Sequence, residues 1–252
     1  MQRSLGPGLD NADAHRYARE EGTSKPVVKT VKGLAVPYMK LLYALKIDGG
    51  ENIPDEGPVI IAPNHKSFWD AFFVAAATKR PIRFMGKSEL FEGRGGRMLI
   101  RLGAFPVRRG SSDEEAIETA REILRGGGLL ALFPEGTRVR DPVELGKPHK
   151  GAARLALETG ATIVPAAITG TEKLFAGPLP RPGRVRVSFG EPIRVEAADP
   201  SPEAAGDLLE GKVWPEVERE RERLLSHPGV IAAGIAALGL GAGVAARRRR
   251  RR

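Results

Sequence analysis

The middle of the chain alternates short apolar runs with longer stretches of mixed polarity. Short runs such as Val59–Ala62 are typical of buried strands, and the stretches between them are long enough for helices. We expect strands near residues 45–50, 58–62, 81–85, 104–108, 129–133, 162–168 and 184–189. We expect helices near residues 69–79, 88–101, 112–126 and 150–159. This alternation predicts an α/β domain over residues 47–200, with a mixed, largely parallel sheet flanked by helices and a functional site at the strand ends.

The N-terminal part of the chain divides into two segments of different character. Residues 1–26 are polar and contain no apolar run, so they predict a disordered arm without a signal peptide. Residues 27–46 place apolar side chains near helical spacing, accompanied by lysines, and Pro37 is expected to kink this helix or to begin a second one. A basic amphipathic helix can lie in a membrane interface. The alternative, a helix packed on the domain with its lysines in solvent, remains open.

Composition narrows the class of protein. The 252 residues are 41% hydrophobic and 28% charged, which suits one globular domain with a sizeable core. No cysteine is present, so disulfides and thiol nucleophiles are excluded. The net charge is +9, but Arg247 to Arg252 contribute six of these charges and the rest of the chain carries only +3. A nucleic-acid-binding function would therefore depend on the tail alone.

A histidine and an aspartate follow the second predicted strand. His65 and Asp70 are five positions apart in the segment Asn-His-Lys-Ser-Phe-Trp-Asp. In a continuous helix this spacing would place the two side chains about 140° apart. They can meet if His65 lies in the turn before a helix and Asp70 in its first turn, and they would then form a general-base pair. The alternative is that His65 caps a helix and Asp70 is a surface charge.

Two further strand ends carry arginine. Residues 129–138 end in Pro-Glu-Gly-Thr-Arg, and residues 102–110 end in Val-Arg-Arg-Gly. Glycine permits close approach of a ligand to the backbone, and arginine offers a two-pronged donor for phosphate. Two such ends suit one anionic site at the edge of a sheet, although each alone is more typical of an ordinary strand exit with a solvated arginine. The run 162–168 contains Pro165, which indicates a strand end or a bulge.

Together these segments resemble the four motif blocks of the glycerolipid acyltransferases, and among them the 1-acylglycerol-3-phosphate acyltransferases most closely. The blocks are Asn64-His65 with Asp70, Gly103 to Arg109, Phe133 to Arg138 and Ile163-Val164-Pro165. Each block is weak alone, but the order and spacing of the four match over roughly residues 45–192. The fourth block departs from the family pattern, because an alanine follows Pro165 where a larger residue is common.

The resemblance implies a specific chemistry without an acyl-enzyme. His65, oriented by Asp70, would activate the free hydroxyl of 1-acylglycerol 3-phosphate, which would attack the thioester of acyl-CoA or acyl carrier protein and give phosphatidic acid. Arg109 and Arg138 would hold the phosphate of the acceptor. The residues that would shape this pocket are Glu135, Gly136 and Thr137. No cofactor is implied beyond the acyl-donor co-substrate.

The residues themselves agree with this chemistry and leave some alternatives open. No Gly-x-Ser-x-Gly elbow is present, and Ser67 has no support as a nucleophile. No cluster with metal-ligand spacing is visible. The acceptor could instead be glycerol 3-phosphate, another lysophospholipid or a glycolipid. A non-catalytic protein that binds lipid or acyl carrier on the same fold is the alternative from another class.

The C-terminal part bears on membrane association. Residues 201–227 predict a polar helix broken at Pro215, and residues 228–252 combine an uncharged stretch, Gly229 to Ala246, with the arginine tail. That stretch would be about 27 Å long as a helix, which barely spans a bilayer. With the catalytic domain in the cytoplasm, one span would put the arginines outside, against the positive-inside rule. We therefore expect a protein on the cytoplasmic face of the cell membrane, in contact with anionic lipids. A single-pass anchor and a disordered tail remain alternatives.

Overall fold

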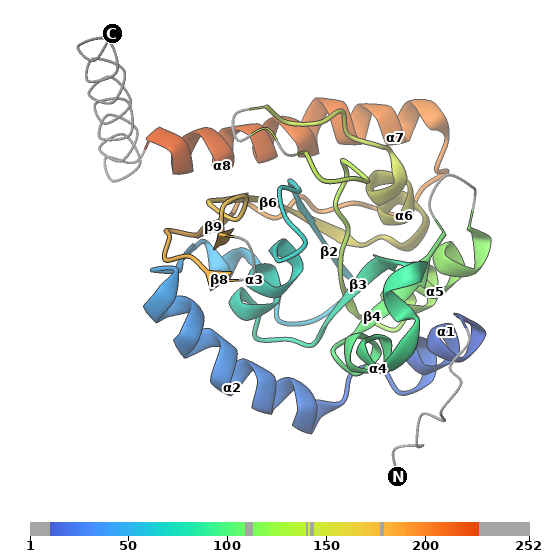
Figure 1. Ribbon diagram of the computed structural model, residues 1–252. Helices are drawn as coiled ribbons and strands as arrows, with labels where there is room; N and C mark the ends of the chain where they lie inside the picture. The colour runs from blue at the N-terminus through green and yellow to red at the C-terminus, as the bar shows by residue number, and fades with distance from the viewer. Residues whose placement is uncertain (1–10, 109–112, 140, 142–143, 177–178, 227–252) are drawn as a thin grey trace, which may run out of the picture.

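A seven-stranded sheet forms the centre of the protein in the computed structural model, which describes residues 11–108, 113–139, 141, 144–176 and 179–226 (Figure 1). The strand order is β1-β9-β6-β2-β5-β3-β4. The bounds are β1 (Lys46–Asp48), β2 (Val59–Pro63), β3 (Ile82–Lys87), β4 (Ala104–Val107), β5 (Leu129–Ala131), β6 (Thr162–Thr169) and β9 (Arg186–Phe189). All neighbouring strands are parallel except β6 and β9. The predicted mixed, largely parallel sheet is confirmed, and each of the seven strands lies where a strand was expected.

Helices cover both faces of the sheet. One face packs against α1 (Asn11–Glu20), α5 (Glu114–Arg125), α6 (Gly151–Thr159), α7 (Pro202–Leu208) and the π-helical turn η3 (Leu209–Val213). The other packs against α2 (Lys25–Leu42) and α3 (Asp70–Ala77). The 3₁₀ turn η2 (Ser88–Phe91) and α4 (Gly93–Arg101) connect β3 to β4, and α8 (Trp214–Ser226) runs along β6 and β9. A short 3₁₀ turn, η1 (Gly50–Asn52), follows β1.

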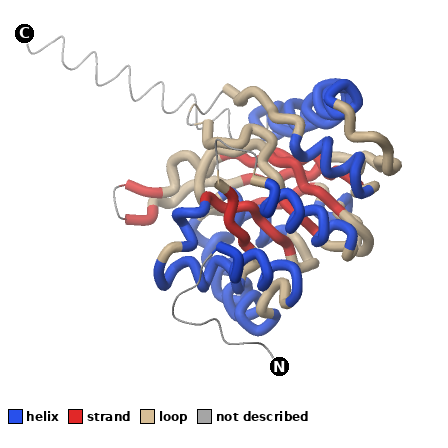
Figure 2. The backbone as a smooth tube through the Cα atoms, turned by 90° about the vertical axis from the view of Figure 1, so that its right-hand side faces the viewer, coloured by secondary structure: helices blue, strands red, loops and turns tan. Residues whose placement is uncertain are grey.

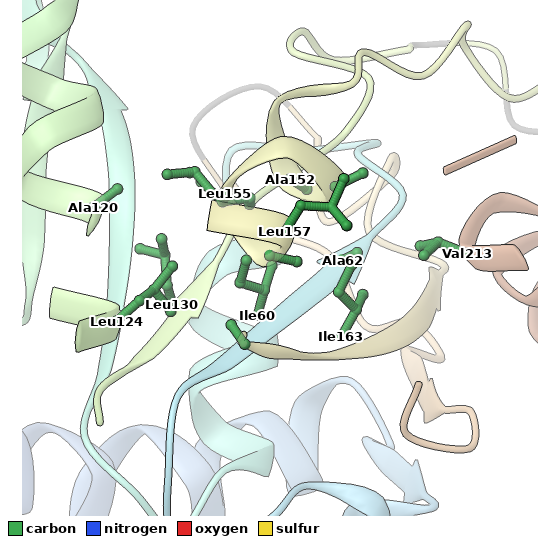
Figure 3. Close-up of a cluster of buried hydrophobic side chains, with 14 of the residues drawn as sticks. Ile60, Ala62, Ala120, Leu124, Leu130, Ala152, Leu155, Leu157, Ile163 and Val213 are labelled. Atoms are coloured by element: carbon green, nitrogen blue, oxygen red, sulfur yellow. The ribbon is translucent and has the colours of Figure 1, made fainter. Parts of the chain in front are cut away.

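Alternation along the strands explains why the sheet has two apolar faces. In β2, Ile60 and Ala62 point toward α5 and α6, while Val59 and Ile61 point toward α3. Figure 3 shows Ile60 meeting side chains of β5, β6 and α6 in the first of these cores. Each fully buried isoleucine contributes about 2–3 kcal/mol relative to an exposed one. The central strands are buried on both faces, which is why they read as continuous apolar runs.

The N-terminal arm was predicted wrongly for the part that the structure describes. Residues 11–20 form α1, which packs against α5 and β4 and buries Ala14, His15, Tyr17 and Ala18. The reason is that four side chains on one helical face suffice to dock a short polar helix on a preformed surface. No long apolar run is needed for this, so the segment looked disordered in the sequence.

The two helical segments that flank the domain also differ in detail from expectation. The helix α2 continues through Pro37 without interruption. The C-terminal polar segment is not broken at Pro215. The helix α7 continues through the π-helical turn η3 into α8, and Pro215 follows that turn as the second residue of α8. Among the residues that the structure describes, no helix combines the length and apolar character needed to cross a bilayer. The predicted apolar segment and arginine tail, residues 228–252, lie outside the described residues.

Candidate active site

His65 and Asp70 meet at the C-terminal end of β2. His65 lies in the loop before α3, Asp70 is the first residue of that helix, and the His65 Nδ1 atom is 2.9 Å from Asp70 Oδ2. This is the arrangement that the five-residue spacing required. With the Nδ1 proton donated to the carboxylate, Nε2 is left as the proton acceptor of the ring. Asp70 is fully buried, and His65 is 8% exposed.

Backbone donors fix the carboxylate of Asp70. Its Oδ2 atom also accepts hydrogen bonds from the backbone N–H groups of Lys66 (2.6 Å) and Ser67 (2.8 Å). Its position at the first turn of α3 places the negative charge at the positive end of the helix dipole. Asp70 Oδ1 is buried without a hydrogen-bond partner among the described residues. The carboxylate is therefore held in one orientation, with its charge turned toward the histidine.

Asn64 explains why the chain leaves β2 at this point. Pro63 ends β2, whereas Pro165 lies inside the partner strand β6, opposite Ala62, and neither proline can donate to the ladder. The strand therefore continues past Pro165, where a strand end or a bulge was expected. The side chain of Asn64 replaces the missing strand pairing, because its amide donates to the Ile168 carbonyl (3.1 Å) and accepts from the Ile168 N–H (2.7 Å). The main chain is thereby free to turn, and His65 is directed out of the sheet on the α3 side.

The imidazole of His65 lies against an aromatic wall. The ring of Phe133 stacks on it with centroids 4.1 Å apart and planes inclined by 27°. Phe133 follows β5, the strand next to β2, and strand alternation puts it on the same face as Ala131. The stacking restricts rotation of the imidazole and excludes water from one side of it. This residue belongs to a motif block quoted above, but the block itself gave no indication of the stacking.

Glu135 holds the loop that surrounds His65. Its Oε1 atom accepts from the backbone N–H of His65 (2.9 Å), and Oε2 accepts from that of Gly146 (3.0 Å). The side chain is 2% exposed. The backbone N–H of Val139 donates in turn to the His65 carbonyl (2.9 Å). Glu135 thus shapes the site through the backbone, because both of its oxygens bind main-chain donors.

Lys66 is a site residue that the sequence did not indicate. Its ammonium group donates to the carbonyls of Asp141 (2.6 Å) and Glu144, and it is 5% exposed. Burial lowers the pKa of this lysine, and the charge of Arg221 adds to the effect. The only available signal was its position beside His65, and a lysine in a loop is normally solvated. Lys66 and Glu135 together clamp the loop that follows the Pro-Glu-Gly-Thr-Arg turn.

An apolar cavity of about 450 Å³ opens beside His65. It lies between the sheet, α2, α3 and the η2–α4 connection, and its lining includes residues from both ends of β3, Ile82 and Lys87. A strand of six residues is about 17–20 Å long. The cavity therefore runs from the end of the sheet that carries His65 toward the opposite end, where the Lys32 ammonium donates to the Thr78 carbonyl (2.7 Å).

Cationic side chains mark the end of the cavity near His65. Arg138 lines the cavity and is exposed, and Lys87 lines it from β3 with its ammonium 2.7 Å from Glu89. Gly136 has φ of +64°, and a side chain there would also meet the ring of His149 at 3.1 Å, so the turn requires glycine. Thr137 is exposed beside it. Arg109 lies outside the described residues.

Arg108, the other arginine that follows β4, makes a structural contact. The backbone N–H of Arg108 donates to Asp113 Oδ2 (2.7 Å), and its guanidinium approaches Asp113 Oδ1 at 3.4 Å. Asp113 also caps α5 by accepting from the Ala116 N–H. These contacts join β4 to the next helix. Within the described part of the chain, no group of three or more histidine and acidic side chains is arranged to hold a metal ion.

Comparisons with known proteins agree with this geometry. A model of the acyltransferase family matches residues 44–169, half of the chain, and this range contains His65, Asp70 and the segment from Glu135 to Arg138. The chain is 30% identical to the 1-acyl-sn-glycerol-3-phosphate acyltransferase of Bacillus subtilis over 62% of this chain and 76% of the relative. It is 32% identical to a chloroplast 1-acyl-sn-glycerol-3-phosphate acyltransferase of Arabidopsis thaliana over 62% of this chain, which spans 46% of that longer protein.

A solved structure extends the likeness to the fold. The crystal structure of the 1-acyl-sn-glycerophosphate acyltransferase PlsC from Thermotoga maritima superposes with a TM-score of 0.61 at 28% identity. The match covers 80% of this chain and 82% of that one. Fold, motif positions and sequence identity thus point the same way, and the chain belongs to the acyltransferase family.

Proposed function

We propose that this protein transfers an acyl group from acyl-CoA or acyl carrier protein to the free hydroxyl of 1-acylglycerol 3-phosphate, giving phosphatidic acid. The observation that carries the proposal is the 2.9 Å contact between His65 Nδ1 and Asp70 Oδ2 at the mouth of an apolar cavity. Two curated relatives, at 32% and 30% identity, are named 1-acyl-sn-glycerol-3-phosphate acyltransferases, which supports this acceptor.

The chemistry needs no covalent intermediate on the protein. His65 Nε2 accepts the proton of the acceptor hydroxyl, and the oxygen attacks the thioester carbonyl carbon. The tetrahedral intermediate collapses with cleavage of the carbon–sulfur bond. The imidazolium then returns its proton to the leaving thiolate. Asp70 stabilises the imidazolium between these two transfers, and its fixed orientation means that no reorganisation is needed.

The cavity supplies a site for an acyl chain. Its walls are mainly aliphatic and aromatic side chains from α2, α3 and β3, and its lining reaches both ends of β3, a strand about 17–20 Å long, which leaves room for a long acyl chain. An apolar chain of this size gains about 0.8 kcal/mol for each buried methylene. The carbonyl carbon at its head would then lie near His65, which is the position that attack by the acceptor hydroxyl requires.

The phosphate of the acceptor would lie on the exposed side of the cavity end near His65. Arg138 offers a planar donor fork there, and Arg109 is assigned to the same role from the motif pattern. Gly136 and Thr137 allow a phosphate oxygen to approach the backbone of the turn. The membrane contact would be peripheral and on the cytoplasmic face, because the acyl donors are cytoplasmic and α2 carries lysines but no acidic residue.

The test is a two-substrate assay on the purified full chain. Oleoyl-CoA and oleoyl-lysophosphatidic acid are supplied, and both thiol release and phosphatidic acid are measured for the wild type, His65→Ala and His15→Gln. His15 serves as the matched control, because it is a buried histidine on α1 that does not line the cavity. Phosphatidic acid from the wild type and the control, but not from His65→Ala, is expected.

Other outcomes would redirect the assignment. Thiol release without lipid product would favour a different acceptor, to be sought among glycerol 3-phosphate, other lysophospholipids and glycolipids. Lipid binding without turnover on that panel would favour a non-catalytic lipid-binding protein. Full activity of His65→Ala would exclude His65 as the general base.

A further inference from the structure

The hairpin of β7 (Phe175–Ala176) and β8 (Leu179–Pro180) projects from the body of the protein (Figure 2). Its two strands pair antiparallel, with Phe175 opposite Pro180. The base is anchored, because Leu174 is buried in the core beside α3 and its carbonyl accepts from the Arg181 N–H (2.8 Å). Beyond this anchor, Phe175 is 40% and Leu179 is 68% exposed. A folded hairpin thus presents two large apolar side chains to the surroundings.

Other exposed apolar side chains lie on elements next to the hairpin, and we refer to the whole set as the apolar surface. Six of the eight large exposed hydrophobic side chains of the described residues lie on α2, at the start of α3 or on this hairpin. They are Leu34, Tyr38, Leu41, Trp69, Phe175 and Leu179. The rings of Trp69 and Phe175 are 5.4 Å apart, which joins the hairpin to α3. The backbone N–H of Val185 donates to the Tyr43 carbonyl (2.9 Å), which joins the segment after the hairpin to the end of α2.

Most of the charges around this surface are basic, and the half-buried Glu172 is the acidic residue beside the hairpin. Lys29 and Lys40 are exposed on α2, which contains no acidic residue. Lys173, shortly before β7, and Arg181, directly after β8, are also exposed. Basic groups around an apolar surface match a bilayer, whose headgroups are anionic and whose interior is apolar. Tryptophan at such a boundary is favoured, because its ring is both apolar and a hydrogen-bond donor.

The surface also lies next to the candidate active site. The ring of Trp69 is 5.3 Å from that of Phe72, which lines the cavity together with Phe68. Trp69 directly precedes Asp70, and His65 is in the same loop. A bilayer contact here would therefore bring the entrance of the cavity to the membrane surface.

We propose that the β7–β8 hairpin, with Trp69, is a second membrane contact besides α2 and inserts into an anionic lipid bilayer. The proposal rests on the peripheral membrane association within the proposed function, but it does not depend on which acceptor is acylated. Two separated contacts fix the orientation of a peripheral protein, whereas one helix would leave it free to rotate about the helix axis.

Trp69 provides a local probe for the test. The chain contains two tryptophans, and Trp214 is buried on α8, so full-length Trp214→Phe leaves Trp69 as the only indole fluorophore. Its emission and its quenching by acrylamide are measured with vesicles of phosphatidylcholine alone and of phosphatidylcholine with phosphatidylglycerol. A shift to shorter wavelength and reduced quenching on the anionic vesicles are expected.

A pair of hairpin variants measures the contribution to affinity. Phe175→Ser combined with Leu179→Ser removes the apolar side chains, and vesicle co-sedimentation is expected to weaken about tenfold. Phe175→Leu combined with Leu179→Phe keeps the apolar surface and is the matched control, expected within about twofold of the wild type. Circular dichroism checks that all variants fold.

The outcomes separate this proposal from the proposed function. Sedimentation with unchanged Trp69 emission would overturn it, since another segment would then be responsible for binding. Acrylamide quenching of Trp69 that decreases with rising protein concentration in the absence of vesicles would also overturn the proposal. It would show that a second copy of the protein covers this surface. Acyl transfer to substrate dispersed in detergent micelles is measured in parallel. Its absence would contradict the proposed function without affecting the vesicle result.

Discussion

Replacement of Asp70 by asparagine tests the general-base geometry most directly. The substitution keeps the shape of the side chain but removes the charge that faces His65. Asp70 Oδ2 is 2.9 Å from His65 Nδ1, so the centres of charge of the imidazolium and carboxylate are about 4 Å apart, and at an effective dielectric constant of 20 their attraction is about 4 kcal/mol. Loss of this term from the transition state lowers kcat by about 10³. The equivalent change in a Ser-His-Asp protease costs about 10⁴.

The assay compares initial rates of thiol release and phosphatidic acid formation for the wild type, Asp70→Asn and Ser67→Ala. Ser67→Ala is the matched control, because Ser67 contacts Asp70 only through main-chain groups and both are retained. Its N–H donates to Asp70 Oδ2, and its carbonyl accepts from the Asp70 N–H. Its rate is expected to stay within about threefold of the wild type. Stability must also be compared. The amide weakens two backbone hydrogen bonds but removes a buried charge, so the net change in the free energy of unfolding is about 2 kcal/mol or less.

Two results would refute the reasoning. A folded Asp70→Asn protein with kcat within threefold of the wild type would show that the carboxylate does not stabilise the transition state. A large loss in Ser67→Ala would point to the serine hydroxyl as a participant in the reaction. A rise in KM alone for Asp70→Asn would indicate a role in binding, which the buried position of the carboxylate does not predict.

Three other predictions follow from single contacts. Burial lowers the pKa of His15 below its ordinary 6.5, so the unfolded chain binds the proton more tightly than the folded one. The free energy of unfolding should therefore fall as the pH decreases through about 6.5. Urea unfolding at pH 7.5 and 5.5 should show a smaller fall for His15→Gln than for the wild type. Lys66→Met should lower the free energy of unfolding by about 1–3 kcal/mol and speed amide hydrogen exchange near residues 138–146. Unchanged exchange in this segment would show that Lys66 does not hold the loop. Ala76 lines the cavity about 9 Å along α3 from Asp70, so Ala76→Phe should block long acyl donors and spare short ones. Equal losses of rate with dodecanoyl-CoA and oleoyl-CoA would contradict the assigned cavity.

The sheet could be predicted because its strands are short, apolar and separated by clear helical stretches. Val59–Ala62 and residues 129–131 are buried on both faces, and such runs have few alternatives once their length excludes a helix. The docking of α1 could not be predicted in the same way. Its buried face is small, and its stability depends on α5 and β4, which lie about a hundred residues further along the chain. Local pattern carries no information about such a partner.

Some features of the candidate site could likewise be predicted from local sequence, and others could not. His65 and Asp70 are close in sequence, so their spacing together with the expected strand and helix indicated how they could meet, and the structure has this arrangement. Glu135 and Lys66 were not understood from the sequence, because their hydrogen-bond partners are backbone groups 11 to 78 positions away. A backbone partner has no residue type, so no sequence motif can reveal it. The carboxylate in the Pro-Glu-Gly-Thr-Arg turn therefore looked like a ligand group, although both its oxygens hold main-chain N–H groups.

Because of the strand order, the motif blocks lie at different distances from His65, the proposed general base. The strand β5, which leads to Arg138, is adjacent to β2, which leads to His65, whereas β4 is three strands away. At about 4.8 Å between neighbouring strands, the end of β4 lies about 14 Å from the end of β2. A glycerol phosphate is short, so an arginine that contacts its phosphate while the hydroxyl is at His65 is best placed after β5. An arginine that follows β4 must reach across the end of β3, past Lys87. For the proposed acceptor, the strand order therefore favours Arg138 over an arginine after β4 as the phosphate ligand, a distinction that the linear order of the motifs does not contain.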